Sequence, residues 1–161
     1  MKKIFSGIYY LSVMLLLVFS SCLRAGLEEL PAFEEAEITD VKFEFRYKDM
    51  ADINPLDKEP IVKVVSLTLR NKVINKDNAT VTCTLEVPAA NDSFTESIRN
   101  TVSLSSIVGK FNVSTAAMVE PSAGSPVLGT PGDWSKANKY IIKAANGSTK
   151  EWTVTVTDLT K

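Results

Sequence analysis

The sequence predicts an all-β protein built as a sandwich of two antiparallel sheets. Three observations support this prediction: several runs alternate apolar and polar residues with a period of two, turn residues separate these runs, and no long stretch shows helical periodicity. The chain beyond its N-terminal segment has the length of one domain with one core. We therefore expect two sheets that bury their apolar faces together, and a small barrel is the structural alternative.

The first 22 residues have the pattern of a bacterial export signal. Lys2 and Lys3 precede an apolar run over residues 4–19, and the run ends in Phe19-Ser20-Ser21-Cys22, which resembles a lipobox. In a lipobox the cysteine is acylated and becomes the new N-terminus. We therefore expect residues 1–21 to be a lipoprotein signal peptide and Cys22 to be the site of lipid attachment. The alternative is an uncleaved membrane helix, which the small and polar residues in the run and the lack of a following basic cluster disfavour.

Residues 22–37 are expected to form a short acidic tether. This segment contains Pro31 and several glutamates but little pattern that could form a core. Because the glutamates repel one another, an extended and solvated linker is favoured over a helix. The tether would hold a domain of residues 38–161 away from the membrane.

Three alternating strands are expected in the first half of the domain. The first covers residues 41–47, and the Asn-Pro and Glu-Pro pairs in residues 49–60 then predict a loop. The second strand is centred on Leu67, and a turn over residues 75–78 separates it from the third. The apolar faces of the second and third strands are Val65, Leu67 and Leu69, and Val81, Cys83, Leu85 and Val87.

The second half is less regular until its end. The pattern of residues 88–110 leaves helix, strand and loop open, whereas residues 111–115 predict a strand that continues weakly through residues 118–119. Prolines and glycines between residues 121 and 132 then predict a long loop. A hairpin completes the chain, because Tyr140 and Ile142 can pair through the Asn146-Gly147 turn with a strand that carries Trp152, Val154 and Val156.

About six to seven antiparallel strands in a domain of this size indicate an immunoglobulin-like β-sandwich. The disulfide and the strand-C tryptophan of antibody domains are missing from the sequence, so the prediction concerns the architecture and not membership of the antibody family.

The composition excludes several classes of function. The chain has no histidine, which removes the commonest general base, the commonest zinc ligand and every Ser-His or Cys-His nucleophile. Loss of Lys2 and Lys3 with the signal peptide changes the formal net charge from −1 to −3, and no basic block is present that could follow a nucleic acid. We therefore expect no nucleic acid partner, no cofactor and no enzymatic activity.

Cys83 would have no disulfide partner if Cys22 carries lipid. It falls on the apolar side of an alternating strand, where a free cysteine behaves as a small buried hydrophobic residue. We expect a structural role for Cys83.

The C-terminal part carries a family resemblance. It combines Gly129-Thr130-Pro131-Gly132-Asp133-Trp134-Ser135-Lys136, the strand Tyr140-Ile141-Ile142, and a Gly-Ser-Thr turn followed by Trp152-Thr153-Val154-Thr155-Val156. This combination resembles a module of Bacteroidetes surface lipoproteins that is related to the domain of unknown function 5018. The match is good over residues 104–157. The resemblance implies an immunoglobulin-like sandwich displayed on the cell envelope, often near glycan-handling systems, and it implies no catalytic residues.

Two places in the domain are candidates for ligand binding. Trp134 lies in a turn-rich loop, where we expect it to close the end of the core and fix the loop, and stacking on a sugar is the alternative; Trp152 is expected in the core. Asp49, Asp52, Asn54 and Asp57 offer oxygen ligands, but their spacing fits no calcium loop and the turn glycine is absent, so a solvated acidic loop and no metal are expected.

The sequence thus predicts an outer-membrane lipoprotein, facing the cell surface or the periplasm, whose non-catalytic sandwich is a binding or spacer module. Its expected partners are the membrane, reached through the lipid on Cys22, and a glycan or an envelope protein. The alternative is a structural subunit of an adhesive or fimbria-like assembly, in which an exposed edge strand accepts a strand from a neighbour.

Overall fold

The computed structural model of the protein describes residues 32–122 and 124–161. The predicted signal peptide, the lipid attachment site at Cys22 and residues 22–31 of the predicted tether lie outside the described residues. In the described part of the chain, no helix has both the length and the apolar character needed to cross a membrane.

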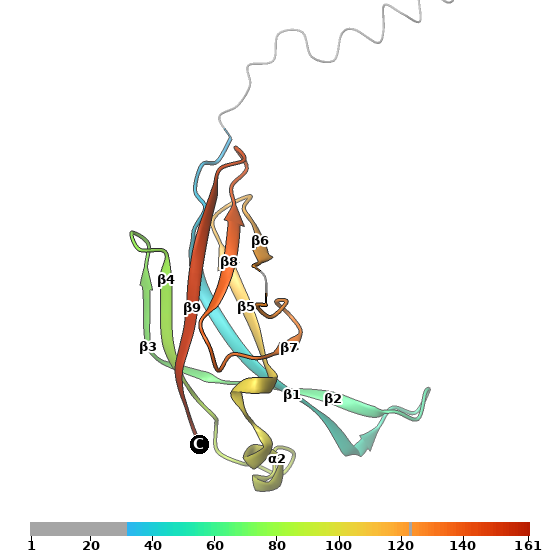
Figure 1. Ribbon diagram of the computed structural model, residues 1–161. Helices are drawn as coiled ribbons and strands as arrows, with labels where there is room; N and C mark the ends of the chain where they lie inside the picture. Colours follow the sequence, from blue (N-terminus) through green and yellow to red (C-terminus); the bar gives the residue numbers. More distant parts are fainter. Residues whose placement is uncertain (1–31, 123) are drawn as a thin grey trace, which may run out of the picture. The chain divides into compact units, whose positions relative to one another are not determined.

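The described residues form two β-sheets that share one core, and this confirms the predicted all-β sandwich. One sheet has the strand order β2-β1-β5-β7, and the other has the order β3-β4-β9-β8-β6 (Figure 1). All strand pairs are antiparallel except β4 and β9, which run parallel. The elements are β1 (Ile38–Ile53), β2 (Pro60–Ser66), β3 (Thr68–Asn75), β4 (Thr80–Glu86), α2 (Glu96–Thr101), η1 (Leu104–Ser106), β5 (Ile107–Val113), β6 (Met118–Pro121), β7 (Pro131–Gly132), β8 (Asn138–Lys143) and β9 (Thr149–Thr160).

The core lies between the two sheets and follows the alternation of the sequence. In β4 every second side chain is buried, namely Val81, Cys83 and Leu85, while the threonines between them are partly exposed. The same alternation buries three side chains of β9, namely Trp152, Val154 and Val156. The other sheet contributes buried side chains of β1, namely Val41, Phe43 and Phe45. These are the apolar faces that the period of two predicted.

The segment predicted as a single second strand consists of two strands in different sheets. β2 ends at Ser66 and β3 begins at Thr68, and Leu67 between them is buried, with its backbone N–H donating to the Phe43 carbonyl at 3.0 Å. Val65, Leu67 and Leu69 all contact the shared core. Because the alternation continues across the change of sheet, the sequence pattern does not reveal it.

The predicted loop over residues 49–60 is shorter than expected. β1 continues to Ile53, and β2 begins at Pro60. The Lys63 ammonium group bridges from β2 to Asp49 at 2.8 Å and to Asp52 at 3.1 Å, so ion pairs hold this part of the hairpin together without a buried face. Figure 1 shows that the end of the β1–β2 hairpin extends away from the rest of the sandwich.

The central segment that the sequence left open contains short helices. Thr95 caps α2 through its side-chain oxygen, which accepts from the Ile98 N–H at 3.4 Å, and η1 leads into β5. β5 begins at Ile107, before the predicted start at residue 111, and it does not continue into β6. A turn that contains Ala116, with φ of 59°, separates the two strands. β5 lies in the sheet of β1, whereas β6 lies in the sheet of β8 and β9.

The C-terminal hairpin is confirmed. Tyr140 lies opposite Trp152, and the turn between β8 and β9 contains Gly147 with φ of 88°, a conformation that suits glycine. With β2 and β3 counted separately and short β7 included, the described residues form nine strands.

Residues 32–37 of the predicted tether are bound to the sandwich. Ser114 donates to the Glu35 carbonyl and accepts from the Glu37 N–H at 3.1 Å, and the Trp152 indole donates to the Ala36 carbonyl at 2.9 Å. Ala36 is buried in the core. The chain therefore enters the sandwich along a hydrogen-bonded path before β1 begins.

Candidate functional site

Trp134 lies in the core and has no exposed surface. Its indole donates to the Ile107 carbonyl at 3.0 Å, and its backbone N–H donates to the Leu104 carbonyl at 2.7 Å. The ring packs edge-on against Phe43, with 4.9 Å between ring centroids, and stacks on Tyr140 at 6.0 Å. A ring enclosed in this way has no face to offer a sugar, so the geometry assigns Trp134 to packing.

Gly109 of β5 explains how so large a ring fits between the sheets. A Cβ atom at position 109 would lie 2.3 Å from Cζ2 of Trp134, which is far inside van der Waals contact. The indole therefore occupies the space that any other side chain at this position would need. The loop containing Trp134 is held in place by this pairing.

The acidic residues at the end of β1 and in the loop that follows it are engaged with protein groups. Lys63 bridges Asp49 and Asp52, and its hydrogen bond to Asp49 is the main cause that holds the pKa of this carboxyl below its ordinary value. Asn54 donates through its side-chain amide to Asp57 at 3.1 Å. Within residues 32–122 and 124–161, no cluster of three or more acidic, cysteine or histidine side chains could hold a metal ion.

Cys83 is buried in β4, where burial raises the pKa of its thiol to about 11. The thiol is therefore protonated near neutral pH, and its nucleophilic thiolate form is scarce. The geometry gives Cys83 the packing role that its strand position predicted.

A charged cluster covers the outer face of the β1 sheet. Glu44 is buried and accepts from Arg46 at 2.6 Å and from Lys110, while Arg46 also donates to the Gly129 carbonyl at 2.9 Å. The two cations share one carboxylate, and Arg46 also ties the loop at Gly129 to β1. This cluster explains how an alternating strand can bury a glutamate on its polar side.

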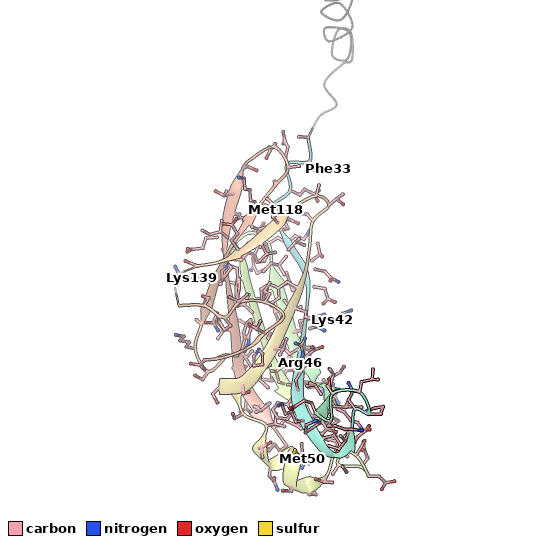
Figure 2. All side chains as sticks on the ribbon, turned by 90° about the vertical axis from the view of Figure 1, so that its right-hand side faces the viewer. Phe33, Lys42, Arg46, Met50, Met118 and Lys139 are labelled. Atoms are coloured by element: carbon pink, nitrogen blue, oxygen red, sulfur yellow. The ribbon has the colours of Figure 1, made fainter. Side chains whose placement is uncertain are left out.

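Exposed apolar side chains gather at the end of the β1–β2 hairpin, residues 48–64, which we call the arm. Figure 2 shows β1 leading past Lys42 and Arg46 to the arm, where Met50 is labelled. Of the ten large apolar residues that are exposed in the described chain, six belong to the arm: Met50 at 74%, Ile53 at 43%, Leu56 at 92%, Ile61 at 37%, Val62 at 54% and Val64 at 54%. Apolar side chains gathered outside a core are typical of a surface that contacts a partner.

Sequence reasoning missed the arm because it treated residues 49–60 as a solvated loop. A signal was present just beyond that loop. In Ile61-Val62-Lys63-Val64-Val65, apolar residues occupy both phases of the alternation, which predicts a strand that presents apolar side chains on both faces. Only one of these faces meets the core, through Val65.

Comparisons with known proteins agree with the fold. The sequence model of the DUF5018-related family matches residues 38–155. A crystal structure of a candidate secreted protein from Bacteroides fragilis NCTC 9343 is 43% identical, with a TM-score of 0.73, over 81% of this chain and 100% of that chain. No curated protein matches this sequence.

Proposed function

This chain belongs to the DUF5018-related family, and from its fold and exposed arm we propose that it is a lipid-anchored cell-envelope protein with a non-catalytic binding module. Three features support this function. The N-terminal residues carry the lipobox pattern that ends at Cys22, the similar Bacteroides fragilis protein is described as secreted, and the chain has no histidine. The sandwich would be held at the outer membrane by lipid on Cys22.

The arm carries the proposal because its apolar side chains have no partner within the sandwich. Both tryptophans of the chain are buried, and the most exposed apolar side chains of the arm, Met50 and Leu56, carry no aromatic ring. Sugars are usually bound by flat aromatic faces, whereas methionine is enriched at protein interfaces and exposed apolar patches often mark them. We therefore favour an envelope protein over a glycan as the partner.

Retention of envelope components on immobilised protein tests the arm. The chain from residue 22 on, with Cys22→Ser to remove the lipid site, is compared with the Met50→Lys, Leu56→Lys double variant. Met118→Lys is the matched control, because Met118 is 58% exposed on β6, outside the arm. We expect an envelope protein to be retained by the unchanged chain and the control and lost with the double variant. Equal retention by all three, or retention of polysaccharide alone, would argue against an arm that binds protein.

The lipid anchor has a separate test. In the full chain, Cys22→Ser should abolish labelling by a radioactive or clickable fatty acid and should move the protein from the membrane fraction to the soluble fraction. Lipid labelling that persists in the variant would remove Cys22 from the proposal and leave the arm unaffected.

The second candidate is a structural subunit of a surface assembly. The observation that favours it is the exposed edge of β2, which lies at the border of its sheet and could accept a strand from a neighbour. Polymers that grow with protein concentration would support this function. Species that stop at a fixed small size would contradict it.

A further inference from the structure

β2 differs from the other edge strands of the described sandwich in its regular stretch from Ile61 to Ser66, which contains no bulge or proline; Pro60 precedes this stretch and Lys63 lies within it. β3, at the edge of the second sheet, is interrupted between Arg70 and Val73 and carries Asn71 with φ of 49°. β6 has four residues and ends in Pro121, and β7 has two residues. Bulges, prolines and short length are the usual means of preventing strand addition. β2 has seven residues, and its pairing with β1 is regular from Ser66 to Ile61.

The register of β2 shows which backbone groups lie on its free edge. Leu67 donates to the Phe43 carbonyl, so the odd-numbered residues of β2 point their backbone groups toward β1. The N–H and C=O groups of Val62, Val64 and Ser66 therefore point outward. In the described part of the chain, no backbone or side-chain group bonds to them. Three residues with aligned donors and acceptors are a template for another strand.

We propose that β2 pairs in antiparallel fashion with β2 of a second copy of this chain, about a two-fold axis at Val64. Antiparallel pairing of identical strands joins outward residues only to outward residues, so the free groups of one copy match those of the other. The proposal rests on the arm being a contact surface, and it names a second copy as the partner at the β2 edge.

Charge and hydrogen bonding select the axis at Val64. An axis at Lys63 would place two lysines directly opposite one another, which is destabilising. An axis at Val62 would place Val64 opposite Pro60, which has no N–H to donate. With the axis at Val64, Val64 pairs with its own counterpart and Val62 pairs with Ser66. Each outward N–H and C=O of these three residues then has a partner.

The side chains suit the same arrangement. Val62 and Val64 are each 54% exposed on the outer face of the sheet, and the two-fold axis would bring the valines of both copies together. Lys63 lies on the opposite face, where Asp49 and Asp52 already neutralise it, and it would face Val65 of the second copy. A contact between single strands is small, so we expect a weak dimer that forms at high protein concentration.

Sedimentation of the chain from residue 22 on, with Cys22→Ser, tests the dimer. We expect a monomer–dimer equilibrium without larger species, because a two-fold contact closes on itself. Val64→Pro removes an outward N–H without removing a hydrogen bond to β1, and Val64→Lys adds like charges at the axis, so each should weaken the dimer at least about tenfold. Val73→Lys, at a residue 57% exposed on β3, is the matched control and should leave the dimer unchanged. Thermal melting of each variant checks that it is folded.

Crosslinking tests the position of the axis. In the same background, Val64→Cys should give a covalent dimer with a short thiol crosslinker, because the two Cβ atoms would lie about 5 Å apart. Val73→Cys should not, and buried Cys83 is shielded from the reagent. A monomer at every concentration, or a dimer that Val64→Pro and Val64→Lys leave unchanged, would overturn the proposal. Retention of an envelope protein through Met50 and Leu56 is measured separately, so failure of the dimer and failure of the proposed function are distinguishable.

Discussion

Replacing Gly109 by alanine tests how tightly the core is packed around Trp134. The added Cβ atom would lie 2.3 Å from Cζ2 and 2.7 Å from Cη2 of the indole. To restore an ordinary contact of 3.4 Å, the ring or the strand must move by about 1 Å. Phe43 and Tyr140 pack against the ring, and its hydrogen bond to the Ile107 carbonyl opposes such a shift.

We expect Gly109→Ala to lower the free energy of unfolding by about 3 kcal/mol. Overpacking a core costs roughly 1–3 kcal/mol, and a weakened buried hydrogen bond adds about 1 kcal/mol. The free energy is measured by urea unfolding, followed through tryptophan fluorescence. Backbone strain does not enter this value, because Gly109 is not among the glycines with positive φ.

A double-mutant cycle identifies the cause. Trp134→Phe removes the part of the indole that meets the added methyl group, so Gly109→Ala should cost less than about 1 kcal/mol in that background. Trp152 is present in every variant of the cycle and remains as the fluorescent probe. If the losses of unfolding free energy in the two single variants simply add in the double variant, the steric reasoning is refuted, and the effect of Gly109→Ala lies in the strand itself.

Three further predictions concern other parts of the sandwich. Ser114→Ala should lower the free energy of unfolding by about 1–2 kcal/mol, since it removes two hydrogen bonds to residues 35 and 37. It should also speed proteolysis within residues 32–37, and an unchanged cleavage rate would show that other contacts hold this segment. Burial by itself raises the pKa of Glu44, but hydrogen bonds from Lys110 and Arg46 outweigh this effect and lower the pKa below 4.5. The ionised carboxylate therefore stabilises the fold above pH 4.5, and this contribution is lost as the pH falls through the pKa of the folded state. Urea midpoints measured between neutral and acid pH should therefore fall less steeply in Glu44→Gln, and equal slopes would contradict this role. In the Cys22→Ser chain, the Cys83 thiol, with a pKa of about 11, should react with a thiol reagent at pH 8 only after unfolding, whereas rapid labelling of the folded protein would show access to it.

The strands of the core could be predicted from the sequence because one face of each strand is buried and the other is not. In β4 and β9, buried valine, leucine and tryptophan alternate with threonine, so burial alone produces a period of two that is visible in the sequence. The Asn146-Gly147 turn was predicted for an equally local reason, since glycine adopts the positive φ that the turn requires. Such features depend on each residue and its immediate neighbours.

The change of sheet at Leu67 and the arm could not be predicted in the same way. Val65, Leu67 and Leu69 keep one alternation while the chain passes from one sheet to the other, because the core they share lies between both sheets. Residues 49–53 show no alternation, because neither face of the arm is buried there and pairing with Lys63 holds the strand instead.

The position of Trp134 shows the same limit at the candidate site. Its loop is rich in glycine and proline, and such a loop is compatible both with a ring exposed to a ligand and with a ring turned inward. Gly109 leaves the space that the indole fills, although the two residues lie far apart in the sequence. The space for a side chain that residues far apart in the sequence form together produces no periodic pattern in the sequence.

The sequence by itself determined the all-β class, the apolar faces of the main strands, the closing hairpin and the family to which the chain belongs. These properties follow from alternation, turn residues and local motifs. Only the tertiary structure decided that Trp134 packs in the core, that Ser114 binds the segment before β1, and that the arm leaves apolar side chains and the β2 edge uncovered. The reason is physical: burial and the pairing of strand edges depend on which distant segments come together in the fold.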